Sequence, residues 1–134
     1  MPKRLLQALA ILSLGVSSPA LASEETTQVR ISLSTQTMEI YHDGELVETT
    51  PVSTGKPGHE TPTGVFHIIY RDRTHYSRKY HAPMPYAQFI TDYGIALHAG
   101  HVPGYAASHG CIRLPADVAK RLWDENITEV DIDE

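Results

Sequence analysis

The first hydrophobic pattern in the chain is an alternation that is typical of strands. In residues 29–33, Val, Ile and Leu alternate with polar side chains, which predicts a strand with one buried face. Residues 38–42 repeat the alternation more weakly, and residues 45–52 form a returning run. Asp43-Gly44 stands between these two runs and suits the positive φ angles of a tight turn. The pattern therefore predicts a strand followed by a β-hairpin.

Three more apolar runs predict strands, and segments rich in proline and glycine separate them. These runs are residues 65–70, 94–98 and 128–132. The segment 82–86 reads Ala-Pro-Met-Pro-Tyr, in which each proline lacks an N–H donor and restricts the residue before it. We therefore expect residues 82–86 to form a surface loop.

One helix is predicted late in the chain. Pro115 suits the first turn of a helix, and Val118, Leu122 and Trp123 supply an apolar face at helical spacing. Asn126 favours the left-handed conformation that ends many helices. Several short strands and one late helix together predict a mostly β domain.

The N-terminus has the order of features of a secretory signal peptide. Two basic residues precede a mostly apolar run over residues 5–16, and small residues end at Ala22. An uncleaved membrane anchor is the alternative, but the run is shorter than the roughly 20 apolar residues that cross a bilayer. We expect cleavage after Ala22, a polar tail over residues 23–28 and one folded domain over residues 29–134. The mature chain would then have no membrane span.

The charge of the chain disfavours nucleic acid as a partner. The full sequence has 11 basic and 16 acidic residues, and its net charge is −5. Removing Lys3 and Arg4 with the signal leaves 9 basic residues and a mature charge near −7. Nucleic-acid-binding domains instead carry a basic surface. The 112 residues that follow the signal suffice for one small domain with a single core.

Cys111 is the only cysteine, and it lies in the sequence Ser108-His109-Gly110-Cys111. It cannot form a disulfide within the chain, so it is an intermolecular bridge, a buried small residue or a working thiol. His109 and the upstream His98 can each act as a base toward a thiol nucleophile. The N–H groups of Gly110 and Cys111 are candidates for an oxyanion site. This cluster suits acyl transfer.

The same side chains leave a metal site as an alternative. His98, His101, His109 and Cys111 are all potential zinc ligands, and a zinc-dependent hydrolase would need several of them. No CxxC or HExxH motif accompanies them. We therefore expect neither a metal nor another cofactor.

Four basic side chains gather in a short window before the proline-rich segment. They are Arg71, Arg73, Arg78 and Lys79. A solvated loop is the simpler interpretation of residues 71–79, and a patch or lid that attracts substrate carboxylates is the alternative.

The region around the cysteine resembles the signature of the L,D-transpeptidase (YkuD-type) catalytic domain of bacterial cell-wall enzymes. The matching segments, in the order of that family, are residues 51–55 (PVSTG), 61–66 (TPTGVF), 84–86 (MPY), 96–100 (ALHAG) and 108–114 (SHGCIRL). The resemblance covers nearly all of the mature chain. It implies a β-sandwich of mixed sheets, with one helix in the C-terminal region and the cysteine in a groove.

The resemblance also implies roles for individual residues. Cys111 would be the nucleophile and His98 the base, oriented by the backbone carbonyl of Ala99. His109 and Gly110 would shape the thiolate and oxyanion surroundings. Ser108 and Ala99 would belong to the groove, and Arg113 and Tyr86 would bind the substrate. Arg113 would anchor a substrate carboxylate or hold its loop.

One departure from the family pattern leaves the base open. Only ten residues, Ala99 to Ser108, separate His98 from His109, whereas many members have a longer spacer. His101 and His109 therefore stay alternatives to His98.

The implied substrates are the stem peptides of peptidoglycan, reached after export to the periplasm or cell wall. The reaction would release the terminal D-alanine and pass the acyl group to an amine, which forms a 3→3 cross-link. Water and a protein lysine are alternative acceptors, and removal of an attached protein is a further variant. A non-catalytic wall-binding domain is the alternative from another class. The sequence leaves the oligomeric state open.

Overall fold

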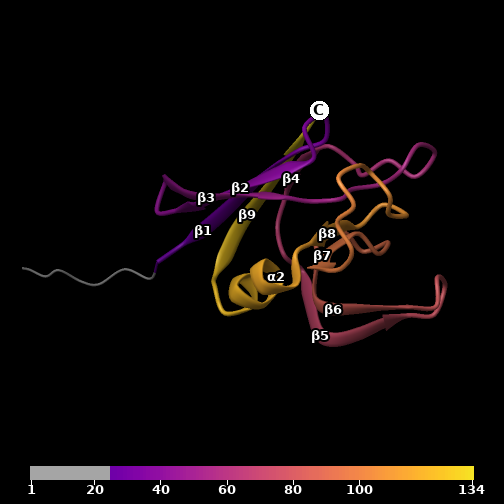
Figure 1. Ribbon diagram of the computed structural model, residues 1–134. Helices are drawn as coiled ribbons and strands as arrows, with labels where there is room; N and C mark the ends of the chain where they lie inside the picture. Colours follow the sequence, from indigo (N-terminus) through magenta and orange to yellow (C-terminus); the bar gives the residue numbers. More distant parts are fainter. Residues whose placement is uncertain (1–24) are drawn as a thin grey trace, which may run out of the picture.

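The computed structural model describes residues 25–134, which form two mixed β-sheets and a helix (Figure 1). The first sheet has five strands in the order β3-β2-β1-β9-β4. Their bounds are β1 Thr27–Ser32, β2 Thr37–His42, β3 Glu45–Pro51, β4 Gly64–Phe66 and β9 Ile127–Asp133. This sheet is mixed because β1 and β9 run parallel while the other pairs are antiparallel.

The second sheet has four strands in the order β5-β6-β7-β8. Their bounds are β5 Tyr70–Ser77, β6 Ala82–Phe89, β7 Ala96–Ala99 and β8 Ile112–Leu114. Here β7 and β8 run parallel. The helix α2, Ala116–Trp123, packs against β7 and β6. These elements confirm the predicted mostly β fold with mixed sheets and a helix in the C-terminal region.

The predicted hairpin forms at the expected turn. Asp43 and Gly44 have φ angles of 49° and 85°, and they join β2 directly to β3. Positive φ at both central residues gives the mirror-image turn whose twist matches paired strands. The hairpin prediction is confirmed because an Asp-Gly pair adopts these angles at low cost.

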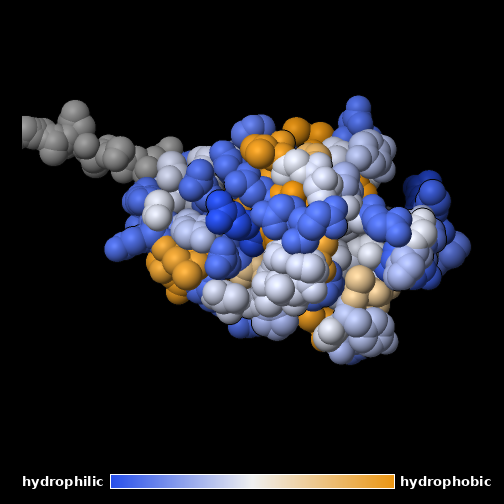
Figure 2. Space-filling view, turned by 90° about the horizontal axis from the view of Figure 1, so that it is seen from above, coloured by the Kyte–Doolittle hydropathy of each residue, from blue (hydrophilic) through white to orange (hydrophobic). Residues whose placement is uncertain are grey.

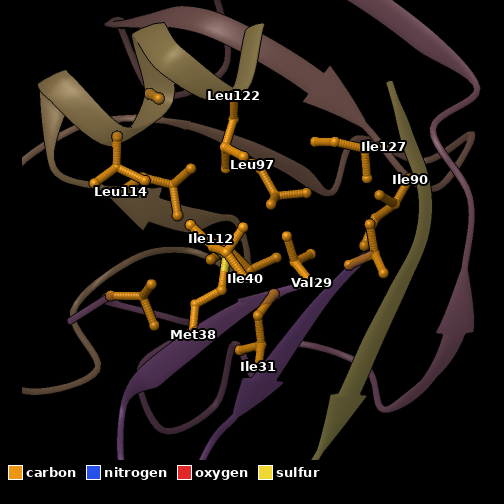
Figure 3. Packing of buried hydrophobic residues seen from close by; sticks show 14 of the residues in the cluster. Val29, Ile31, Met38, Ile40, Ile90, Leu97, Ile112, Leu114, Leu122 and Ile127 are labelled. Atoms are coloured by element: carbon orange, nitrogen blue, oxygen red, sulfur yellow. The ribbon is translucent and has the colours of Figure 1, made fainter. Parts of the chain in front are cut away.

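The core fills the space between the two sheets (Figure 3). Its members come from both sheets and the helix, and those at most 2% exposed include Val29, Ile31, Met38, Ile40, Leu97, Ile112, Leu114 and Leu122. The alternation in residues 29–31 places alternate side chains of β1 on this buried face. Sheet and helix thus share one hydrophobic cluster, and β7 and β8, which carry or adjoin the candidate site, are anchored in it.

The proline-rich segment is a strand, so the prediction of a surface loop over residues 82–86 is wrong. Pro83 and Pro85 pair with Tyr76 and Thr74 of β5. On the other side, β6 pairs with β7 only at Gln88 and Phe89. The prolines therefore lie where β6 pairs with one strand only. No second strand is there to accept a hydrogen bond from the N–H groups that prolines lack.

The basic window before this segment is also regular structure. Residues 70–77 form β5, and only residues 78–81 form the turn to β6, so the solvated-loop interpretation is wrong for most of the window. The run predicted over residues 65–70 divides, because β4 ends at Phe66 and β5 begins at Tyr70 in the other sheet. The short connection between them lets the chain change sheets.

The helix ends without the predicted left-handed residue. Asn126 does not have a positive φ angle, and the residue after the helix, Asp124, has φ −90°. The N–H groups of Asp124 and Glu125 instead bond to the carbonyls of Arg121 and Leu122. The last turn is therefore closed by short-range backbone bonds, which replace the expected cap.

The N-terminal predictions fall partly outside the described residues. The expected signal peptide, residues 1–22, lies there entirely. β1 begins at Thr27, so Thr27 and Gln28 belong to the sheet and not to the polar tail.

Within residues 25–134, no helix has the length and apolar character needed to cross a membrane. Hydrophilic side chains cover most of the face in Figure 2, between separate hydrophobic areas.

Candidate active site

A groove of about 1020 Å³ lies beside the second sheet and contains the cysteine. Its lining comes from parts of five segments, residues 58–60, 75–85, 93–101, 108–113 and Ala116. It brings together most of the predicted site residues, namely His98, Ala99, Ser108, His109, Gly110, Cys111 and Arg113. A volume of this size accommodates a peptide-sized ligand.

His98 is positioned by the strand β7 and by the backbone of its neighbour. The side chain is buried, and its Nδ1–H donates to the carbonyl of Ala99 at 2.8 Å. This bond fixes the tautomer in which Nε2 carries the lone pair. Burial lowers the pKa of His98 from its ordinary value of 6.5, an effect opposed by the Ala99 bond. Burial therefore favours a neutral imidazole, and its Nε2 makes no hydrogen bond within residues 25–134.

Cys111 lies at the end of the turn that leads into β8. Its Sγ donates to the carbonyl of Gly94 at 3.4 Å, and the side chain is half-buried against Met84, Ala87, Phe89 and Ala96. Burial raises the pKa of the thiol above its ordinary value of 9.0. Burial therefore favours the neutral form of both residues, a thiol and a neutral imidazole.

Ser108 shapes the turn that carries the cysteine. Its buried Oγ donates to the carbonyl of Cys111 at 2.6 Å and accepts from the N–H of Gly110 at 3.0 Å. The N–H of Gly110 is therefore occupied, and the expectation that it faces an oxyanion is wrong for this arrangement. The N–H of Cys111 is left as the candidate oxyanion donor in this turn.

Gly110 occupies a conformation that other residues rarely adopt. Its φ is +130°, and a Cβ at this position would lie 3.0 Å from Cδ1 of Ile95. The Thr61 hydroxyl donates to the Gly110 carbonyl at 2.7 Å and accepts from the N–H of Gly55 at 2.9 Å. Buried Thr61 thus ties a distant loop to the turn of the cysteine. Sequence reasoning missed this role, although Thr61 opens one of the segments shared with the family.

His109 lies at the rim of the groove in a cluster of aromatic rings. Its ring stacks on Tyr80 with centroids 3.9 Å apart, and His59 meets it edge-on at 5.2 Å. The pKa of His109 is lowered by removal from water and then by the charge of Lys56. The β5–β6 turn thereby contacts the turn of the cysteine through Tyr80, a contact that the sequence did not indicate.

Arg113 holds the loop that precedes the cysteine. Its guanidinium donates to the carbonyls of His101 and Ala107 at 3.4 and 3.3 Å, and a Cβ on Gly100 would lie 3.2 Å from its Cγ. Arg113 was expected either to anchor a substrate carboxylate or to hold its loop, and these bonds support the second role. His101 is exposed at the rim and contributes its backbone carbonyl to this contact.

Tyr86 is not among the residues that line the groove, so the structure gives its predicted substrate contact no support. Its ring lies 6.0 Å from Trp123 and beneath the guanidinium of Arg73 at 5.6 Å. Its φ of 58° interrupts the regular alternation of β6. This local conformation, which the sequence does not announce, gives Tyr86 a packing role.

The basic residues of the window contact different parts of the domain. Arg71 stacks on Trp123 at 3.8 Å and donates to the Trp123 carbonyl. Lys79 lines the groove and lies 5.4 Å from the Tyr80 ring. The window is therefore not one patch, and its C-terminal end forms part of the groove wall.

Within residues 25–134, no three His, Cys, Asp or Glu side chains form a group that could hold a metal.

Comparison with known proteins finds relatives of this chain in sequence and in structure. The profile of the L,D-transpeptidase catalytic domain (YkuD) matches residues 26–131. L,D-transpeptidase 1 of Mycobacterium tuberculosis is 34% identical over 110 aligned positions, which cover 69% of this chain and 44% of the relative.

Solved structures agree with this assignment. The L,D-transpeptidase of Stackebrandtia nassauensis superposes with a TM-score of 0.73 and 29% identity, covering 84% of this chain and 57% of that one. The L,D-transpeptidase LdtMt1, in complex with imipenem, gives a TM-score of 0.74 and 26% identity, with coverages of 81% and 59%. The chain thus spans about half the length of the relatives it matches.

Proposed function

Because the chain belongs to the family of L,D-transpeptidase catalytic domains, we propose that it is a cysteine acyltransferase acting on peptidoglycan tetrapeptide stems. One observation carries the proposal. Cys111 and His98 line the same groove, and the bond from His98 to the Ala99 carbonyl leaves Nε2 free to take the thiol proton. A nucleophile, a base and a group that orients the base are the parts that covalent acyl transfer needs.

The first half of the reaction forms an acyl-enzyme. His98 Nε2 takes the proton from Cys111, and the sulfur attacks the carbonyl of the third residue of a donor stem. The N–H of Cys111 is a donor for the resulting oxyanion. Nε2 then returns the proton to the leaving nitrogen, and the terminal D-alanine departs. A thioester at Cys111 is left, with His98 neutral again.

The second half transfers the acyl group to an acceptor. An amine of a neighbouring stem attacks the thioester, the carbon–sulfur bond breaks and a 3→3 cross-link forms. Water in the same place gives an L,D-carboxypeptidase, and a protein lysine gives an anchoring enzyme. We place the reaction outside the cytoplasmic membrane, at the wall, because the stem peptides lie there and residues 1–22 have the signal-peptide pattern.

Cys111→Ala tests the proposal with tetrapeptide muropeptides as substrate. Wild type should release D-alanine and accumulate dimers, whereas Cys111→Ala should do neither, as followed by mass spectrometry of the products. Imipenem, which is present in the LdtMt1 structure, provides a second measurement. Wild type should gain the mass of one covalent adduct, and the alanine variant should not. Release of D-alanine by Cys111→Ala at the wild-type rate would contradict the cysteine mechanism.

A further inference from the structure

A second histidine with a carboxylate partner faces the groove, and the acylation half of the reaction does not use it. Nδ1 of His75 lies 3.1 Å from Oδ2 of Asp72, both on β5. A carboxylate only accepts, so Nδ1 carries the hydrogen and Nε2 of the neutral ring carries the lone pair. His75 Nε2 has no hydrogen-bond partner within residues 25–134, and the residue lines the groove.

His75 is connected to Cys111 by a packing neighbour that the two residues share. Its ring meets Phe89 edge-on with centroids 5.1 Å apart. Phe89 belongs to the small buried cluster against which Cys111 packs. After burial and the Ala99 bond, the charges of Arg113 and His75 further lower the pKa of His98. His75 and Cys111 therefore line the same groove and share Phe89 and its cluster as packing neighbours.

Transfer to an amine requires a proton acceptor beyond His98. An aliphatic amine has a pKa of about 10 and arrives at neutral pH as an ammonium group. Its nitrogen must lose two protons to become the nitrogen of a secondary amide. One proton passes through Nε2 of His98 to the departing thiolate and restores the thiol. Nδ1 of His98 is committed to Ala99, so the second proton has no acceptor in the Cys111–His98 pair.

We propose that His75, held by Asp72, is the base that accepts this second proton and so prepares an amine acceptor for attack on the thioester. This inference rests on the proposed function and specifies its acceptor as an amine. His75 Nε2 removes one proton from the ammonium group, and the free nitrogen attacks the acyl carbon. The nitrogen–carbon bond forms as the carbon–sulfur bond breaks. His98 carries the remaining proton to sulfur, and the imidazolium of His75 releases its own to water in the open groove. Asp72 is a positioning residue that acts through His75.

The test compares two acceptors in wild type, His75→Gln and Asp72→Asn. The donor is the tetrapeptide stem, and the acceptor is either a second stem or hydroxylamine, an amine that is already unprotonated at neutral pH. We expect His75→Gln to lose transfer to the second stem by on the order of a hundredfold, the usual share of general base catalysis. Transfer to hydroxylamine and formation of the imipenem adduct should stay near wild type. Asp72→Asn should show the same selective loss in smaller measure.

The controls separate this proposal from the proposed function. His67→Gln changes a histidine that bonds the Thr128 carbonyl, and His67 does not line the groove, so both transfers should be unchanged. Absence of an acyl-enzyme in wild type would contradict the proposed function itself. Acyl-enzyme formation followed only by hydrolysis would overturn the role of His75 alone. Equal losses with both acceptors, or none with the second stem, would also overturn it. If His75→Gln does not fold, Asp72→Asn provides the same test: its transfer to the second stem should fall while its transfer to hydroxylamine does not.

Discussion

At the scale of single residues, the site contains two groups whose neutral forms burial favours. Burial lowers the pKa of His98 and raises the pKa of Cys111. The imidazole of His98 can take the thiol proton only while its Nε2 is unprotonated. Acidification therefore removes the base, and it does so at a lower pH than for an exposed histidine.

The pH dependence of acylation follows from these directions. The rate of imipenem labelling should stay level as the pH falls through 6.5, the ordinary pKa of histidine, and should decline only on its acid side. His98→Gln should lower the rate by about 10² to 10⁴, the range for a general base, and should remove the acid decline. A thiolate absorbance at neutral pH that is missing in Cys111→Ala would instead indicate a resting thiolate and imidazolium.

Gly110 gives a second prediction at this scale. Gly110→Ala places a side chain at φ +130° and 3.0 Å from Ile95, which should lower the free energy of unfolding by about 1–3 kcal/mol. Because the turn of Cys111 must shift, the rate of imipenem labelling should fall as well. Denaturant unfolding and intact mass measure the two effects.

Gly104→Ala is the matched control for the backbone alone. Gly104 also has a positive φ, of 103°, but a Cβ there meets nothing within 4 Å. This variant should lose stability without losing labelling in its folded fraction. Labelling of Gly110→Ala at the wild-type rate would show that the turn tolerates the side chain.

At the scale of elements, a buried hydroxyl joins two loops into one wall of the groove. Thr61 is 3% exposed and connects the Gly55 N–H to the Gly110 carbonyl. Thr61→Val keeps the shape and removes both bonds, so it leaves a buried donor and a buried acceptor unpaired. We expect a loss of about 1–3 kcal/mol in the free energy of unfolding and slower imipenem labelling.

Two further variants make this prediction specific to the hydroxyl. Thr61→Ser keeps the hydroxyl and should label at close to the wild-type rate. Thr63→Val alters an exposed threonine in the same segment and should change neither measurement. A fully stable Thr61→Val would mean that water or a shifted backbone satisfies the Gly55 and Gly110 groups.

Local patterns in the sequence correctly predicted the elements that neighbouring residues determine. The hairpin at Asp43-Gly44, the alternation of β1 and the apolar face of the helix all depend on neighbouring residues, and all three form. The strand β6 did not follow this rule. Its prolines are tolerated because of where β5 and β7 lie beside them, which is a property of the sheet and not of the segment.

The site shows the same division. The family resemblance predicted roles for Cys111, His98 and the Ala99 carbonyl, and the groove brings these residues together. Tyr86 was misplaced because its positive φ turns the strand, and the occupied N–H of Gly110 was missed because Ser108 bonds it from two residues away. Tyr80 and His75 line the groove, and Thr61 bonds the Gly110 carbonyl, from positions distant in sequence, so only the tertiary structure reveals their roles.

At the scale of the whole molecule, the sheet that lacks the groove still supports it through a common core. Ile31 of β1 is fully buried in the cluster that contains Leu97 and Ile112, the residues beside His98 and Cys111. The first and last strands pair in parallel, so both ends of the domain close the same sheet. A domain of this size with one continuous core should unfold as a single unit.

Ile31→Ala tests this coupling from the sheet that is remote from the groove. Truncating a fully buried isoleucine should lower the free energy of unfolding by about 2–5 kcal/mol. Ile69→Ala, at a residue that is 58% exposed, should change it by less than about 0.5 kcal/mol. Fluorescence of Trp123, the single tryptophan, reports on the helix beside the second sheet, and far-ultraviolet circular dichroism reports mainly on strands. In both variants the two signals should change at the same denaturant concentration, and the folded fraction should label with imipenem at the wild-type rate. Separate transitions in Ile31→Ala would show that the second sheet and its groove can persist after the first sheet has opened.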